Sequence, residues 1–414
     1  MSLIDTITVL VCLSAVFSYI NHRWLRLPLT IGLMAIALAM SLTLVVLDGF
    51  GFGIGRDARD FIDGIDFNET LMHGMLSFLL FAGALHVDLD ALLRYKWIIA
   101  ALASLGVVVS TVIVGTLSFY AFRLVGLDLP LLACFIFGAL ISPTDPIAVL
   151  GILRQVGAPA SLEIKIAGES LLNDGVGVVV FLLLTELAVQ DAPTAGHVAL
   201  FFLQEVGGGA AIGLLLGTVA HRMLKSIDQH QVEILITLAL VMGGYALAGA
   251  LHASGPITVV VAGLLIGNHG RRFALSESSR EYLDTFWELV DELLNAVLFV
   301  LIGLEVLVLT FRADYLEAGL LAIPIVLLAR FVSVGLPVWV LSLAQDVSRR
   351  ATLILTWGGL RGGISVALAL SLHRGTTRDA LLVITYTVVV FSILVQGLTL
   401  GRLIRAATSA PPPA

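Results

Sequence analysis

Charged residues are scarce in this sequence. Asp, Glu, Lys and Arg make up 13% of its 414 residues, against about 25% in an average soluble protein. Hydrophobic residues account for 58% of the chain. So few charges cannot cover the surface of a soluble protein of this length, which argues against a soluble globular fold and indicates an integral membrane protein.

Cysteine is almost absent, and there is no clustering of metal-binding side chains. Cys12 and Cys134 both lie in apolar segments, which argues against a disulfide framework. No Cys or His cluster has the spacing of a zinc site. The first apolar segment has no basic region before it and no small-residue cleavage site after it, so we interpret it as a retained membrane span. We expect no cofactor and no nucleic-acid partner.

Long apolar runs make up most of the chain. About 20 apolar residues are needed to cross roughly 30 Å of hydrocarbon, and thirteen windows fit this description, although two are short. They cover residues 3–20, 29–47, 70–86, 97–122, 129–156, 161–188, 198–224, 231–252, 254–268, 285–310, 315–343, 350–373 and 379–403. We therefore expect an all-α polytopic membrane protein with about 13 transmembrane helices in one domain over residues 1–405. A disordered Pro-containing tail is expected over 406–414.

Positive charge is distributed unevenly between alternate loops. Most of the 23 Lys and Arg residues follow odd-numbered predicted helices, and basic loops favour the cytoplasm. This pattern predicts an N-terminus outside and a C-terminus in the cytoplasm, and it agrees with an odd number of helices.

Two predicted helices contain helix-breaking residues. The fifth contains Pro143 and Pro146, each of which removes a backbone donor and disfavours helical geometry at the residue before it. The twelfth contains Gly358-Gly-Leu-Arg-Gly-Gly363, where backbone entropy opposes a continuous helix. A proline kink is the simpler interpretation of the first, but two breaks in corresponding helices are typical of the substrate site of a secondary transporter.

The breaks also suggest an internal repeat. The fifth and twelfth helices are seven apart, so residues 1–188 and 231–405 can be paired as two halves of opposite orientation. The segment 198–224 then becomes the connecting helix. The predicted architecture is an inverted repeat with two broken helices.

Carboxylates lie within these apolar segments. An ionisable side chain in hydrocarbon costs at least about 2.5 to 3.5 kcal/mol, so it tends to face the protein interior and to mark an ion path. Asp145 lies at the first break. On the sixth helix, Ser170 and Asp174 are four residues apart, as are Glu169 and Asn173, which places both pairs on one face.

Oxygen ligands for an alkali cation can be assembled from these residues. If the polar face of the sixth helix packs against the first break, the ligands would come from Asp174, Asp145, Ser170 and Thr144. Removal from water disfavours the charged form of a carboxylate and a bound cation favours it, so proton and cation compete for one site. That competition is an exchange mechanism, and we expect Asp174 to be the competing group.

Arg361 lies at the second break and requires a partner. A buried guanidinium needs a carboxylate or the negative end of a half-helix dipole. Glu169 is the expected partner, with Asp145 as the alternative. Arg330 and Glu305 are the other charges well inside helices, and we assign them no role in transport.

Three segments together resemble the signature segments of the NhaP-type and eukaryotic NHE-type sodium/proton exchangers, in the monovalent cation:proton antiporter superfamily. They are Ser142-Pro-Thr-Asp-Pro-Ile147, Gly168-Glu-Ser-Leu-Leu-Asn-Asp-Gly-Val176 and Gly358-Gly-Leu-Arg-Gly-Gly-Ile-Ser365. The resemblance implies an NhaA-like antiporter fold with two broken, crossing helices. It also implies a homodimer in a bacterial inner membrane, in which a core moves against a dimerisation scaffold.

The resemblance also assigns roles. It implies cation and proton binding by Asp174, Asp145, Ser170 and Thr144, supported by Asn173 and by a Glu169–Arg361 bridge. The Asn173-Asp174 pair resembles the electroneutral branch, which implies one proton per cation.

One segment departs from the pattern. Related bacterial exchangers often carry a glutamate in a Phe-Glu-Gly segment of the third helix, where this chain has Phe81-Ala82-Gly83. His73, His86 and Asp88 are the nearby candidates to replace that glutamate.

Three classes of function compete. We expect a transporter that exchanges Na⁺ or Li⁺ for H⁺, and a K⁺/H⁺ exchanger would use the same machinery. A sodium-coupled solute symporter would need a roomy polar cavity with further donors. An intramembrane aspartyl protease would need two aspartates that share a water, and the contexts of Asp145 and Asp174 instead suit coordination, so we expect no enzyme activity.

Overall fold

The computed structural model describes residues 3–50, 74–157, 160–189, 195–270, 276–310, 312–342 and 349–409, and its regular elements within these ranges are all helical. The first half contains α1 (Leu3–Ile20), η1 (Asn21–Leu25), α2 (Leu29–Gly49), α4 (Leu76–His86), α5 (Leu89–Arg94), α6 (Lys96–Ala103), α7 (Leu105–Leu124), α8 (Leu131–Ile141), α9 (Ile147–Val156) and α10 (Ala160–Val189).

The second half continues with helices and short π or 3-10 turns. These are α11 (Ala195–Phe202), η3 (Leu203–Gly208), α12 (Gly209–Lys225), α13 (His230–Ala250), α14 (Gly255–Leu265), η4 (Ile266–Gly270), α16 (Glu277–Leu304), η5 (Glu305–Val308), α17 (Ala313–Ser342), α18 (Arg349–Trp357), α19 (Gly363–Leu370), α20 (Thr376–Phe391), η6 (Ser392–Gln396) and α21 (Gly397–Ser409).

The expected all-α membrane architecture is confirmed. Each of the thirteen predicted windows contains a helix, and within the described ranges eight helical segments are long and apolar enough to cross a membrane. The number of crossings and the inverted repeat stay predictions.

Some helix ends differ from those predicted by hydropathy. α16 begins at Glu277, eight residues before the predicted start, because the Ser276 hydroxyl caps it by accepting a hydrogen bond from the Ser279 amide at 3.2 Å. The added residues are mostly polar, so an apolar window misses them. α21 continues to Ser409, beyond the start of the expected tail at residue 406, and residues 410–414 lie outside the described ranges.

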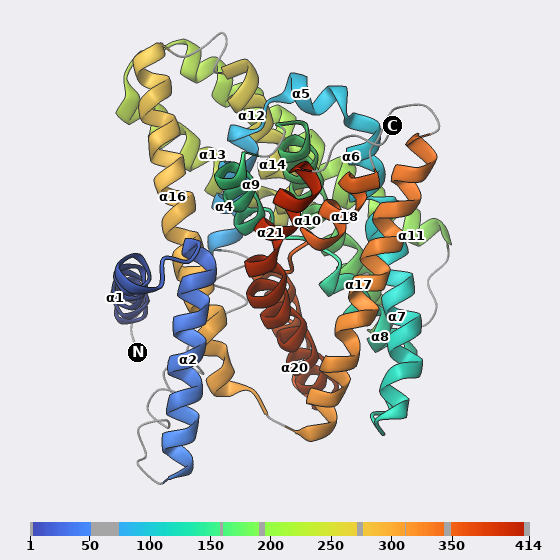
Figure 1. The fold of residues 1–414 in the computed structure, drawn as a ribbon. Coiled ribbons are helices and arrows are strands. Elements are labelled where there is room, and N and C mark those ends of the chain that lie inside the picture. Colours follow the sequence, from blue (N-terminus) through green and yellow to red (C-terminus); the bar gives the residue numbers. More distant parts are fainter. Residues whose placement is uncertain are drawn as a thin grey trace.

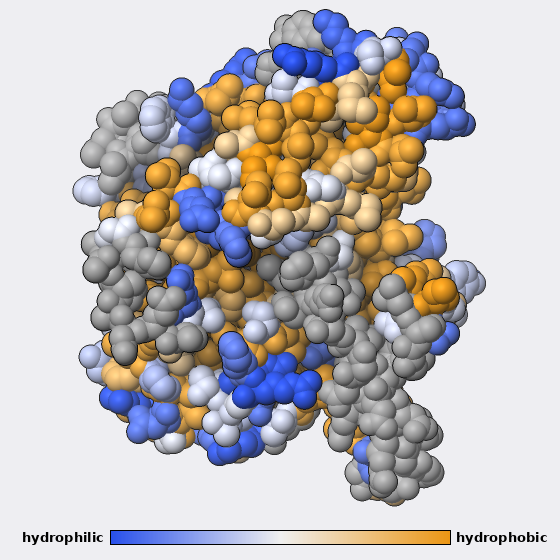
Figure 2. All heavy atoms as spheres, turned by 180° about the vertical axis from the view of Figure 1, so that it is seen from behind, coloured by the Kyte–Doolittle hydropathy of each residue, from blue (hydrophilic) through white to orange (hydrophobic). Residues whose placement is uncertain are grey.

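The interrupted helices lie at the centre of the fold. In Figure 1, α9, α10, α18 and α21 occupy the middle of the molecule, with α2 and α16 on one side and α7 and α17 on the other. The face drawn in Figure 2 gathers apolar side chains between more hydrophilic ends. This distribution is the one that a membrane requires of the surface that it surrounds.

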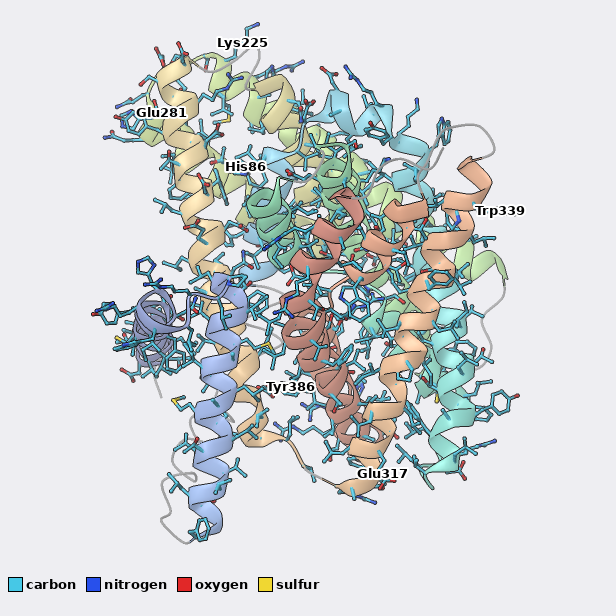
Figure 3. All side chains as sticks on the ribbon, viewed as in Figure 1. His86, Lys225, Glu281, Glu317, Trp339 and Tyr386 are labelled. Carbon is cyan, nitrogen blue, oxygen red and sulfur yellow. The ribbon has the colours of Figure 1, made fainter. Side chains whose placement is uncertain are left out.

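The ends of the molecule agree with the alternation of the predicted loops. Lys225 and Glu281 belong to loops predicted on the same side of the membrane, and they lie at one end of the molecule in Figure 3. Glu317 lies near the start of the predicted span 315–343, which begins on the other side, and it lies at the opposite end of the molecule. Which end faces the cytoplasm stays a prediction.

Candidate cation-binding site

The predicted break in the fifth helix is present. α8 ends at Ile141 and α9 begins at Ile147, with extended or bent backbone between them. Pro143 and Pro146 supply no backbone N–H, so carbonyls at the end of α8 lose the donors that a continuous helix would provide. The chain becomes helical again after Pro146, whose carbonyl accepts from the Leu150 amide at 2.7 Å.

The second break is also present, and it meets the first. α18 ends at Trp357 and α19 begins at Gly363. The Asp145 amide donates to the Leu360 carbonyl at 2.8 Å, so the two interruptions are joined backbone to backbone. A Cβ on Gly362 would lie 2.6 Å from Asp145 Oδ2, so the close approach of the second break to this carboxylate depends on glycine. The predicted crossing of two broken helices is confirmed.

α10 presents its polar face to the first break. The Thr144 and Ser170 hydroxyls are 3.0 Å apart. Asn173 Nδ2 donates to Thr144 Oγ1 at 2.8 Å, and the Thr144 amide donates to Asn173 Oδ1 at 3.3 Å. All three side chains are buried. Asn173 therefore holds Thr144 by both its backbone and its side chain, and it fixes the unwound segment against α10.

Two carboxylates lie beside these hydroxyls. Asp174 is 5% exposed, and its buried Oδ1 accepts no hydrogen bond from the residues that the structure describes. Asp145 is half-buried, and its charge repels that of Asp174. A buried carboxylate oxygen without a donor, next to a second carboxylate, is stabilised by a proton or by a cation.

Arg361 caps the end of α8. Its Nη1 donates to the backbone carbonyl of Ser142 and, at 3.0 Å, to that of Pro143. The Ser142 carbonyl is one that Pro146, four residues on, leaves without a helical donor. The guanidinium therefore lies at the negative end of a half-helix, which is one of the two partners that its burial required.

Glu169 pairs with Arg330 of α17, so the expected Glu169–Arg361 bridge is wrong. Arg330 Nη1 donates to Glu169 Oε1, and Nη2 donates to Glu169 Oε2 at 3.1 Å and to the Leu355 carbonyl at 3.2 Å. Arg330 packs on Gly359 of the second break, where a Cβ would lie 3.0 Å from its Cζ. The planar guanidinium thus binds one carboxylate with both of its Nη atoms and also packs against the second break.

Two further polar residues, which the sequence analysis did not predict, contact the second break from another element. The Ser392 hydroxyl accepts from the Arg361 amide at 2.9 Å, and Gln396 Nε2 donates to the Trp357 carbonyl at 3.1 Å. Both belong to η6, a π turn, and such turns are frequent at functional sites. They supply the broken helix with partners that its own backbone lacks.

Comparison with known proteins places this architecture in a family. The model of the family described as sodium/hydrogen exchanger, transmembrane, matches residues 12–406. The chain belongs to this family. It is 49% identical over 409 residues to the Na⁺/H⁺ antiporter NhaP of Pseudomonas aeruginosa, covering 97% of this chain and 96% of that protein. It is 37% identical over 348 residues to NhaH of Halobacillus dabanensis, covering 82% and 83%.

The fold is similar to that of a solved exchanger. The sodium proton antiporter MjNhaP1 of Methanocaldococcus jannaschii superposes with a TM-score of 0.77 at 19% sequence identity. The match covers 99% of this chain and all of that one. The likeness supports the antiporter fold that the sequence predicts.

Two of the three residues considered as replacements for the absent glutamate, His86 and Asp88, form local hydrogen bonds. His86 Nδ1 bonds to the Ala82 carbonyl at 2.8 Å, within its own helix. Asp88 Oδ1 accepts from the Ala91 amide at 3.1 Å and caps α5. His73 lies outside the described residues. The positions of His86 and Asp88 are explained by local structure, and they give no support to a role in ion binding.

Proposed function

We propose that this chain exchanges Na⁺, or Li⁺, for H⁺ across a membrane. The observation that carries the proposal is the buried Asp174 oxygen without a donor, next to Asp145 and the hydroxyls of Thr144 and Ser170. These groups provide oxygen ligands and negative charge, which hard cations prefer. Membership of the exchanger family and the similarity to the Na⁺/H⁺ antiporter NhaP agree with this assignment.

Exchange follows from competition for one site. In our proposal, a proton and a cation neutralise Asp174 in turn, because either one relieves the cost of a buried charge beside Asp145. Coupling requires that the site changes its access only when one of the two is bound. The unwound backbone at the crossing of the two helices supplies the polar surroundings that such a site needs within the membrane.

We further propose that exchange is electroneutral, one proton per cation. Asn173 cannot titrate, and both polar groups of its side chain are engaged by Thr144. Glu169 is held by Arg330 through two hydrogen bonds. In our proposal Asp174 is the carboxylate that exchanges its proton for the cation, so a single proton taken up by Asp174 replaces a single positive charge.

The assembly in the membrane is part of the proposal. We expect a homodimer in a bacterial inner membrane, as the resemblance to the family implies. Basic residues are concentrated in alternate loops, and this pattern favours an N-terminus outside and a C-terminus in the cytoplasm. The core that contains α10 and both broken helices would move against the scaffold around α2 and α16. Cross-linking in native membranes and labelling of single introduced cysteines from each side test these expectations.

Transport by reconstituted protein tests the function. Proteoliposomes carrying a pH gradient are exposed to Na⁺, Li⁺ and K⁺ in turn, and collapse of the gradient is followed with a pH-sensitive dye. We expect collapse with Na⁺ and Li⁺ that persists when the voltage is clamped at zero. A response to K⁺ equal to that with Na⁺ would favour K⁺/H⁺ exchange, and folded protein that responds to no cation would refute the proposal.

A matched pair of variants controls the assay. Asp174→Asn removes one negative charge from the site, and it should abolish exchange while the protein still inserts and elutes as wild type. Asp128→Asn makes the same chemical change at an exposed carboxylate that pairs with the exposed Arg123, and it should transport normally. Equal loss in both variants would mean that the assay reports charge or expression and not the site.

A further inference from the structure

Helix α16 carries a row of acidic side chains that the proposed exchange does not use. Asp284, Glu288 and Asp291 are spaced by four and three residues, so they lie on one face of the helix. Glu281, near the start of α16, lies at one end of the molecule (Figure 3). At 1.5 Å per residue, Asp291 lies about 15 Å further along the helix. The row therefore runs from that end of the molecule toward its middle.

The same face of α16 packs against the second break. Leu298 lies two helical turns after Asp291, and a Cβ on Gly363 would lie 2.6 Å from Leu298 Cδ1. The negative charge of Asp145, at the crossing of the broken helices, also acts on Asp291. The acidic row thus ends near the candidate site, with Asp291 on the proposed scaffold and Asp145 on the proposed core.

Burial along this face singles out Asp291. Trp287, one turn before it, is fully buried and packs on Phe81 of α4 with ring centroids 4.7 Å apart. Asn295, one turn after it, is 2% exposed. Asp291 itself is only half-buried. It is therefore the place on an otherwise covered stretch of α16 that water or a small ion can reach.

Asn295 adds an unused oxygen at the same place. Its Nδ2 donates to the Asp291 carbonyl at 2.8 Å, and its side chain also forms a hydrogen bond with the Asp291 carboxylate. Its Oδ1 is buried and accepts no hydrogen bond from the residues that the structure describes. A buried amide oxygen without a donor is costly unless another group neutralises it. A cation beside the Asp291 carboxylate would do so, because hard cations prefer such oxygen ligands.

We propose that Asp291 and the Asn295 side-chain oxygen form a second, weaker cation subsite on the path to Asp145 and Asp174. This inference rests on the proposed function, because the ligand is the transported Na⁺. One carboxylate and one neutral amide match a single positive charge. Among the described residues no group of three or more His, Cys, Asp or Glu side chains could hold a metal ion, which argues against a divalent ion here. A cation held at this subsite raises the local concentration from which the central site fills.

The Na⁺ dependence of exchange in proteoliposomes tests the subsite. Asp291→Asn keeps the shape of the side chain and removes its charge, so we expect the apparent KM for Na⁺ to rise at least about fivefold, more than the maximal rate falls. Asp291→Glu keeps the charge and should recover most of this loss. The matched control Glu292→Gln removes an exposed carboxylate from the next position, on another face of α16, and should change the KM by less than about twofold.

Binding of radioactive Na⁺ to purified protein separates the subsite from the central site. The measurement uses the Asp174→Asn variant, in which the central site lacks its competing carboxylate. We expect weak, saturable Na⁺ binding to remain in this variant. It should disappear when Asp291→Asn is added, and it should persist when Glu292→Gln is added instead.

Several results would overturn the inference. They are an unchanged KM in Asp291→Asn, an equal rise in the Glu292→Gln control, or residual Na⁺ binding that does not depend on Asp291. A wild type that exchanges no cation would refute the proposed function, whereas residual binding that depends on Asp291 would still support the subsite. If Asp291→Asn does not elute as folded protein, Asn295→Leu decides, because it removes the amide oxygen and should raise the KM several-fold.

Discussion

Arg330 offers the sharpest test of the structural account, because it occupies the role that the sequence alone gives to Arg361. Glu169 is 1% exposed and Arg330 is 7% exposed, and two hydrogen bonds join them. Removing one partner of such a pair leaves a buried charge without compensation, which costs about 3–5 kcal/mol. We therefore expect both Arg330→Met and Glu169→Met to destabilise the protein by about this amount.

The double variant separates pairing from burial. Replacement of both charges by apolar side chains of similar size is often neutral or stabilising, so Glu169→Met/Arg330→Met should regain most of the loss. The coupling free energy between the two positions is then about 3 kcal/mol or more. Arg361 caps α8 instead and interacts with the Glu169 charge without a hydrogen bond, so for Glu169 and Arg361 we expect a smaller coupling, about 1 kcal/mol.

Unfolding of the purified protein in mixed micelles, with increasing SDS, measures these differences. The double-mutant cycles need only the relative stabilities of the variants in one micelle composition, with the wild type in each series. A large coupling between Glu169 and Arg361, together with a small one between Glu169 and Arg330, would contradict the ion pair described above.

Three other predictions concern the site itself. Gly362→Ala should lower the apparent Na⁺ affinity at least about tenfold, because the added methyl group displaces the Asp145 carboxylate; an unchanged concentration dependence in the liposome assay would contradict this. Thr144→Val removes the hydroxyl that contacts both Ser170 and Asn173, and we expect weaker Na⁺ activation together with a stability loss of about 1–3 kcal/mol, measured in the same two assays. Asn173→Asp loses its donor to Thr144 and adds a charge, so exchange should fall by at least about tenfold, and wild-type turnover would refute the supporting role of Asn173.

The breaks and the site residues could be predicted because they follow from local chemistry. Pro143 and Pro146 cannot donate to a helix, and the glycines near Arg361 oppose one, wherever the segments lie in the fold. The spacing of Ser170 and Asp174 fixes a shared helix face in the same way. Thr144 was expected near this face because it lies next to Asp145 in the break.

The partner of Glu169 could not be predicted because it depends on tertiary packing. Arg330 and Arg361 are both single arginines in apolar segments, and the sequence does not show which of them the fold brings to Glu169. One signal was available in the sequence: the cost of burial that singled out Arg361 applies equally to Arg330. The prolines also leave carbonyls without donors at the end of α8, and these are natural acceptors for the other guanidinium.

The residues that cap the second break from a distant part of the chain could not be predicted either. Ser392 and Gln396 lie more than thirty residues from the groups that they contact, and neither position has a local feature that marks it. The early start of α16 was missed for a different reason, since its first turns are polar and hydropathy detects only the apolar part of a helix.

If a cation and a proton compete for Asp174, cation binding must release a proton, and this release can be measured. Purified protein in weakly buffered detergent solution with a pH-sensitive dye is titrated with Na⁺. We expect the wild type to release protons in a saturable manner and Asp174→Asn to release none. Release by the wild type should fade as the pH rises, because the carboxylate has then already lost its proton. Saturable Na⁺ binding by the wild type without proton release, or equal release by Asp174→Asn, would contradict this competition.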